Sequence, residues 1–129
     1  MEVRTLAVGA FQANAWLAWD PGSGAGFLID PGDEAERILA WIESFSVDVR
    51  LIVATHGHLD HVAAGREVRE ALGVPFALHP DDAPLLAALA ETRALYGLPP
   101  AIPPRIDREL SHGATLAAGG LALEVRHCP

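Results

Sequence analysis

The sequence of 129 residues contains no lysine, a single cysteine and no long hydrophobic run. Cys128 cannot form an internal disulfide alone, and scarce cysteine is typical of a reducing compartment. No apolar stretch reaches the roughly 18 residues that a membrane span needs. The first residues also lack the basic and apolar segments of a secretory signal peptide. These absences predict a cytoplasmic protein that does not enter the membrane.

Basic residues are also few: nine arginines face 17 acidic residues, which gives a formal net charge of −8. A surface of this sign repels phosphate backbones, so nucleic acid is not expected as a partner. Half of the residues are hydrophobic, which is enough to bury a core. The length fits one modest domain, and we interpret residues 1–129 as a single domain.

Short apolar runs alternate with turns and with segments of helical periodicity, which predicts a mixed α/β (α+β) fold with helices packed outside a sheet. Asp33 and Glu36 have the spacing of a capping box at the start of the first helix. Gly73 is suited to end the second helix. Four prolines between residues 99 and 104 predict a stiff loop rather than a domain linker. Strands are predicted over 3–8, 14–19, 26–29, 49–54, 74–78, 114–117 and 121–126, and helices over 34–45, 62–72 and 82–96.

Three of the six histidines fall within six positions, directly after the predicted buried strand 49–54. In an extended segment residues two apart point the same way, so His56 and His58 can grip one ion. The chain then turns into a helix, which brings Asp60 and His61 toward a second ion. Imidazole and carboxylate suit zinc, and also iron or manganese. A polar loop with local hydrogen bonds is the alternative, but three histidines and an aspartate in this order favour metal binding.

The segment Thr55-His56-Gly57-His58-Leu59-Asp60-His61 resembles the T-H-x-H-x-D-H signature of the metallo-β-lactamase superfamily. Three further segments resemble that family in the same order: Asn14–Leu17, which is similar to a strand of its glyoxalase II-like branch, Leu28–Gly32, and Val125–Pro129. The resemblance therefore extends over essentially the whole chain.

This resemblance implies that His56 and His58 bind one zinc ion and that Asp60 and His61 bind a second. It also implies that Asp30 is a buried carboxylate that steadies the metal-binding loop. The alternative for Asp30 is a turn residue of its Asp-Pro-Gly segment. Of the other histidines, His79 is expected to be structural or exposed and His112 to lie in a turn. The resemblance places His127 near the metal region but not among the family's ligands. Cys128 is expected to be a small packed side chain rather than a nucleophile.

The family's pattern continues beyond Pro129 with further metal ligands, so the resemblance implies that this chain is roughly the N-terminal half of a four-layer αββα sandwich. We expect the chain by itself to bind metal weakly and to show little hydrolase activity, because each ion lacks ligands. We also expect the uncovered sheet to be covered by self-association or by a C-terminal segment not in this sequence.

The function that the resemblance implies is hydrolysis of a thioester or similar activated carbonyl in a small-molecule substrate by a metal-bound hydroxide. Asp60 would be the catalytic residue that also orients this hydroxide. An iron-dependent sulfur dioxygenase of the same superfamily is one alternative. A non-catalytic module that binds metal or a partner is another. A nuclease of the superfamily is disfavoured by the acidic charge.

Overall fold

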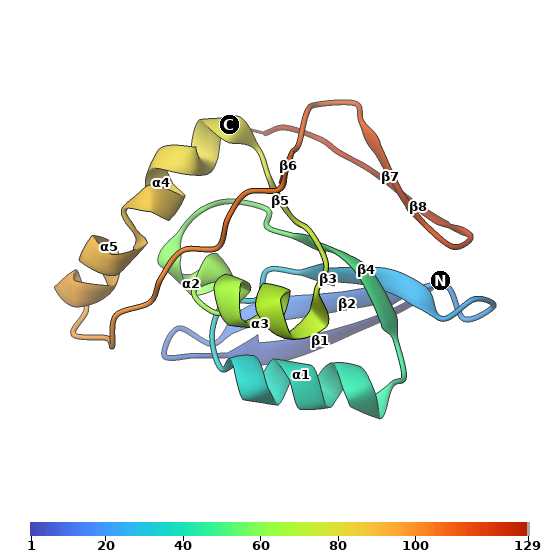
Figure 1. Cartoon of the computed structure of the whole chain (residues 1–129), viewed down its shortest axis with the longest axis horizontal. Coiled ribbons are helices and arrows are strands. Elements are labelled where there is room, and N and C mark those ends of the chain that lie inside the picture. Colours follow the sequence, from blue (N-terminus) through green and yellow to red (C-terminus); the bar gives the residue numbers. More distant parts are fainter. Residues whose placement is uncertain (129) are drawn as a thin grey trace.

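The computed structural model describes residues 1–128, and Pro129 lies outside the described residues. Strands β1 to β6 form one sheet in that spatial order, and β7 and β8 form a separate hairpin (Figure 1). In chain order the elements are β1 Glu2–Val8, β2 Ala13–Trp19, β3 Ala25–Ile29, α1 Ala35–Ser44, β4 Asp48–Val53, α2 Leu59–Val62, α3 Gly65–Leu72, β5 Phe76–Leu78, the 3-10 helix η1 Pro80–Asp82, α4 Ala83–Ala87, α5 Leu89–Leu95, β6 Arg108–Glu109, β7 Thr115–Ala118 and β8 Leu121–Glu124.

The direction of the strands changes within the sheet. Strands β1, β2 and β3 are antiparallel and are joined by short turns, as the sequence predicts. Strands β3, β4, β5 and β6 pair in parallel, with helices in the connections from β3 to β4 and from β4 to β5. Parallel strands need such crossovers, which place helices on a sheet face. The carboxyl ends of β3 and β4 consequently lie side by side, so the loops that follow them meet at one edge of the sheet.

Two apolar layers cover the two faces of the sheet. On one face, Leu17, Leu28 and Ile52 are fully buried with Ile38 of α1 and Val68 of α3. On the opposite face, Phe27, Leu51, Val53 and Ala77 of the sheet form an apolar cluster with Leu116 and Leu121 of the β7–β8 hairpin. Alternation along each strand sends neighbouring side chains to opposite faces. The order of layers is therefore helices, six-stranded sheet, hairpin.

The turn between β2 and β3 is tied to the distant turn between β7 and β8 through Asp20. Its carboxylate accepts hydrogen bonds from the amide of Gly22, the hydroxyl of Ser23 and the amide of Gly120, at 3.0, 2.9 and 2.8 Å. These bonds lower the pKa of Asp20, with the Gly120 amide as the main cause. The hairpin is thus held at its tip as well as through its apolar face.

Helix α1 lies where the periodicity predicts it, but the predicted capping box is wrong. Glu34 stands at the N-cap in the left-handed region at φ 55°, with no side-chain cap. Its carboxylate instead accepts a hydrogen bond from the amide of Gly9 at 2.9 Å, and Asp33 accepts from the amide of Glu34. A tertiary contact to the β1–β2 turn replaces the local cap. Phe45 follows the helix and is 38% exposed, with its ring 5.4 Å from that of Trp19.

Two predicted helices are each broken into shorter pieces. Of the segment 62–72, Val62 ends the short helix α2 and a new helix, α3, begins at Gly65, because the amide of Ala64 donates to the carbonyl of Pro31 at 3.0 Å. Gly73 ends α3 at φ 66°, as predicted. The segment 82–96 becomes η1, α4 and α5, which lie beside the carboxyl ends of the strands rather than over a sheet face (Figure 1). Within residues 1–128, none of the helices combines the length and apolar character that crossing a bilayer requires.

Strand β6 was not predicted, because two residues carry no periodicity. The preceding Asp107 fixes it: its carboxylate accepts from Arg69 at 2.7 Å and from the amide of Phe76 at 2.9 Å. The Arg69 hydrogen bond, with a smaller contribution from the Phe76 amide, lowers the pKa of Asp107 to about 2. The carboxylate therefore joins α3, β5 and β6 in its ionised form.

Asp107 should make the stability of the chain depend on pH below 4. A carboxyl whose pKa is 3.8 unfolded and about 2 folded stabilises the fold above pH 4, and this contribution is lost as the pH falls toward 2. Replacing Asp107 by asparagine is expected to lower the free energy of unfolding at pH 7 by about 1 kcal/mol, since the group is partly screened by solvent. The deficit should shrink at pH 2.5 in urea unfolding. Asp48→Asn removes the exposed pair with Arg50 and should change little at either pH.

Candidate metal centre

The histidine cluster lies where the sequence places it, between the carboxyl end of β4 and the start of α2. His58 is the extended N-cap of α2, with φ −66° and ψ 148°. Asp60 and His61 lie within the single turn of that helix. The predicted change from extended chain to helix is therefore present inside the motif.

All four motif side chains come together. The ring of His56 lies 4.8 Å from that of His58 and 4.0 Å from that of His61, measured between centroids. Nε2 of His61 lies 3.3 Å from Oδ2 of Asp60. One group of possible ligand atoms joins His56 and His61 with Asp30, all within 4.8 Å of one another. How these side chains divide between two ions stays a prediction.

Asp30 follows β3 and is buried, and both its oxygens accept hydrogen bonds from the motif. Oδ1 accepts from the amide of Thr55 at 2.7 Å, and Oδ2 accepts from the Thr55 hydroxyl at 2.7 Å. Nδ1 of His61 lies 3.0 Å from the same Oδ2. Asp30 also has φ 56°, a region that aspartate tolerates better than most residues. A carboxylate engaged in this way is placed to orient the loop.

These contacts determine which nitrogens of the histidines are free. The only hydroxyl proton of Thr55 is donated to Asp30, so the 2.9 Å contact between Thr55 Oγ1 and His56 Nδ1 requires a proton on that nitrogen. The carboxylate of Asp30 likewise requires a proton on Nδ1 of His61. In their neutral forms both imidazoles then keep the Nε2 lone pair for another partner. Fixing the tautomer in this way is a common feature of histidines that bind metals.

The charge state of His56 also favours metal binding. Burial is the main cause that lowers its pKa, and the neighbouring His61 lowers it further. His56 is therefore neutral at pH 7, as a metal ligand must be. Three imidazoles and a carboxylate close together form a donor set that fits zinc or iron.

Two glycines allow the chain to pass closely behind the motif. A Cβ on Gly32 would overlap the carbonyl oxygen of Asp60, and one on Gly57 would come within 2.8 Å of the carbonyl oxygen of Asp82. The amide of Gly57 also lies 3.2 Å from Oδ2 of Asp82. No local pattern in the sequence indicates this contact, because the two residues are 25 positions apart.

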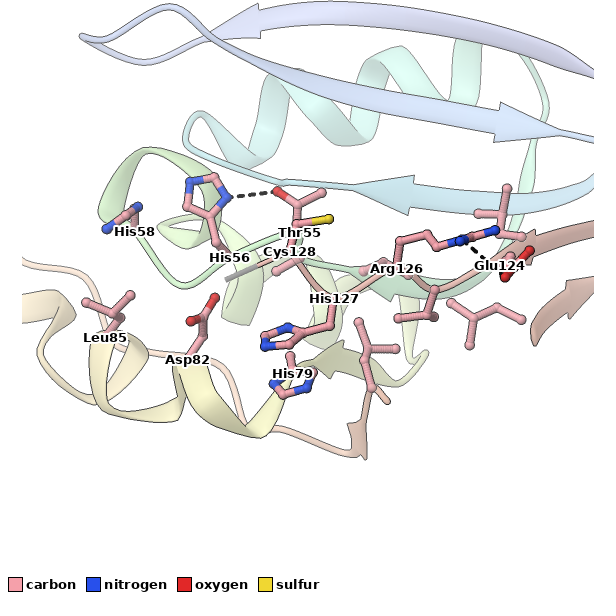
Figure 2. A pocket seen from close by; sticks show the side chains of 16 residues that line it. Thr55, His56, His58, His79, Asp82, Leu85, Glu124, Arg126, His127 and Cys128 are labelled. Carbon is pink, nitrogen blue, oxygen red and sulfur yellow. Dashed lines mark hydrogen bonds and ion pairs between the residues drawn. The ribbon is translucent and has the colours of Figure 1, made fainter. Parts of the chain in front are cut away.

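A pocket of about 730 Å³ opens on His56 and His58 (Figure 2). Its lining is shared between the motif loop, the η1–α4 segment, the β7–β8 hairpin and the segment that follows β8: Val53, Ala54, Thr55, His56, His58, His79, Asp82, Leu85, Leu110, Leu116, Leu123, Glu124, Val125, Arg126, His127 and Cys128. Asp60 and His61 are not part of this lining. One side of the motif thus faces a partly apolar hollow large enough for a small molecule.

The remaining histidines lie outside the motif, and two of them line this pocket. His79 and His127 stack at 3.7 Å with 9° between their planes, and His112 accepts a hydrogen bond from the amide of His127 at 3.0 Å. The structural role expected of His79 is compatible with these contacts. The expectation that Cys128 is packed is wrong: its side chain is exposed and lines the pocket.

The chain is similar to known proteins in both sequence and fold. The family description "Metallo-beta-lactamase superfamily" matches residues 8–129. The hydroxyacylglutathione hydrolase GloC of Haemophilus influenzae is 35% identical over 131 residues, which cover all of this chain and 61% of that protein. An uncharacterized protein of Aquifex aeolicus is also 35% identical, with 60% of its length covered. The chain thus spans about three-fifths of the curated relatives it matches.

Solved structures also superpose on the fold. The B3 metallo-β-lactamase BLEG-1 matches with a TM-score of 0.86 and 27% identity over 99% of this chain and 62% of that chain. TTHA1623, solved in a di-iron-bound form, matches with a TM-score of 0.81 and 36% identity over 88% of this chain and 56% of that chain. The arrangement of sheet, helices and hairpin therefore corresponds to about half of the fold of these proteins.

Proposed function

Because this chain belongs to the metallo-β-lactamase superfamily, we propose that the protein is a metal-dependent hydrolase that cleaves thioesters or similar activated carbonyls. The observation that carries the proposal is the network from Asp30, which leaves Nε2 of His56 and of His61 free beside Asp60. The similarity to a hydroxyacylglutathione hydrolase over the whole chain supports the thioester as substrate.

His56, His58, Asp60 and His61 would hold two divalent ions, and zinc is the ion we propose. Divalent zinc lowers the pKa of water toward about 7 and stabilises negative charge on a carbonyl oxygen. The similarity to TTHA1623 in its di-iron-bound form makes iron the alternative.

The protein's own residues have distinct tasks in this proposal. Asp30 holds the ring of His61 and the backbone of Thr55, and Thr55 holds the ring of His56. Asp60, next to Nε2 of His61, would bind metal and orient the attacking water. The leucines of the pocket, Leu85, Leu110, Leu116 and Leu123, would exclude bulk water from the bound acyl group.

The experiment is turnover of S-lactoylglutathione by the protein with this chain extended to the length of its relatives, purified and loaded in turn with zinc, iron or manganese. Residues 1–129 alone are expected to show little turnover. We expect release of free thiol that stops on chelation and returns with the metal. A metal-loaded protein that leaves the thioester intact would contradict the proposal. Oxygen uptake with glutathione persulfide by the iron-loaded protein alone would favour the sulfur dioxygenase instead.

A further inference from the structure

The second histidine group of the pocket brings together three chain segments. His79 ends β5 at the N-cap of η1, Asp81 lies within η1, and His127 follows β8. One nitrogen of each imidazole and one oxygen of Asp81 all lie within 4.8 Å of one another. Residues 48 positions apart in the sequence thus meet with two imidazoles and a carboxylate, the donor types that zinc, cobalt and nickel prefer.

We propose that His79, Asp81 and His127 form a second site for a divalent transition metal, separate from the His56–His61 motif. The proposal does not depend on hydrolase activity. Oδ2 of Asp81 lies 3.3 Å from Nε2 of His127 and 3.8 Å from Nδ1 of His79. A tetrahedral ion with bonds of about 2.0–2.1 Å separates its ligand atoms by about 3.3–3.4 Å. The atoms of Asp81 and His127 are therefore already at the spacing of two ligands of one ion. Those of Asp81 and His79 are about half an ångström too far apart.

The charge around the group favours a cation. Asp81 supplies a carboxylate that is largely exposed, and Asp82 and Glu124 line the same pocket. Arg126 is the cation among the lining residues, and it pairs with Glu124 at 3.2 Å. With both imidazoles neutral, the site itself has a net negative charge that an ion would neutralise.

Two contacts must change when an ion binds. The stacked rings hold their in-plane lone pairs in nearly parallel planes, so one imidazole must turn. Among residues 1–128, the ring of His127 stacks on His79 and pairs with Asp81. Nδ1 of His79 accepts the amide of Asp81 at 3.1 Å, and the ion would replace that hydrogen bond. Because Asp81 is exposed, water can then solvate its amide. We therefore infer moderate affinity and preference for ions that imidazole binds well, rather than for calcium or magnesium.

The test uses cobalt as the probe in a variant with His56, His58 and His61 all replaced by alanine. We expect one Co²⁺ per chain, with the visible absorption of a four-coordinate ion and an affinity measurable by calorimetry. Adding His79→Gln or His127→Ala should weaken binding by roughly 10-fold or more, and Asp81→Asn should weaken it as well. His112→Gln is the matched control: this histidine contacts the His127 backbone but is not a ligand, so binding should persist.

A second measurement uses the unaltered chain, in case the triple variant does not fold. Zinc is titrated while the imidazole nitrogens of the six histidines are followed by NMR. His79 and His127 should shift together and apart from His56, His58 and His61. The proposal is overturned if cobalt does not bind the folded triple variant, if binding survives loss of both His79 and His127, or if these two histidines do not respond to zinc.

Discussion

Replacing His61 by alanine is expected to weaken metal binding at the motif by at least about 100-fold. The ring centroid of His61 lies 4.0 Å from that of His56, and its Nε2 lies 3.3 Å from Oδ2 of Asp60. The hydrogen bond from Nδ1 to Asp30 leaves this Nε2 free. Its loss removes one donor and leaves Asp30 with one partner fewer. Several kcal/mol of charge stabilisation depend on the ion, so thioester turnover should also fall by at least about 100-fold.

The measurement is metal content after dialysis, followed by calorimetric titration with zinc and by turnover of the loaded protein. His112→Ala is the control, because this histidine is remote from the motif and should leave metal content at the motif unchanged. Undiminished zinc affinity in His61→Ala would show that this imidazole is not a ligand. Thermal unfolding of the metal-free variant would distinguish a lost ligand from a lost fold.

Replacing Asp30 by alanine is expected to lower both stability and metal affinity. It leaves the amide and hydroxyl of Thr55 and Nδ1 of His61 without their buried acceptor, and each unsatisfied donor costs about 1–3 kcal/mol. Alanine at φ 56° adds backbone strain of about 1 kcal/mol. We expect a loss of about 3 kcal/mol or more in the free energy of unfolding, and a loss of about 10–100-fold in zinc affinity.

Asparagine at position 30 separates the causes. Asparagine tolerates the same positive φ and keeps one acceptor oxygen, so it should recover part of the stability. Its NH2 group would face the N–H or O–H donors of Thr55 or His61, so metal affinity should stay low. Asp33→Asn, in the same turn but more exposed, should have little effect on zinc affinity. Wild-type zinc affinity in Asp30→Ala would refute the orienting role of this carboxylate. Urea unfolding of the metal-free proteins measures the change in the free energy of unfolding.

Local patterns in the sequence predicted most of the secondary structure and the motif. The period of α1 and the apolar run of β4 placed these elements correctly, because each depends on neighbouring residues. The capping box failed because Glu34 makes a contact to Gly9 that only the folded chain provides. Helix 62–72 was too long because the amide of Ala64 bonds to Pro31.

The candidate site divides in the same way. Spacing alone indicated His56, His58, Asp60 and His61, because the four lie within one loop. Only the family resemblance indicated that Asp30 steadies the metal-binding loop, and its hydrogen bonds to Thr55, 25 residues away, were not predicted. Asp82 and the stack of His79 on His127 had no local signal, since the first depends on a turn packing against Gly57 and the second on two distant segments meeting.

The Asp20 contact to Gly120 has a consequence for the order of folding. It joins residues 100 positions apart, whereas the β7–β8 hairpin that carries Gly120 forms from neighbouring residues. Closing so long a loop has an entropic cost that only the finished sheet face can offset. The hairpin therefore docks late, after β3 and β4 have paired. Leu116 and Leu123 of that hairpin line the pocket beside His56. The pocket is therefore expected to form only when the hairpin docks, after the metal-binding loop has folded.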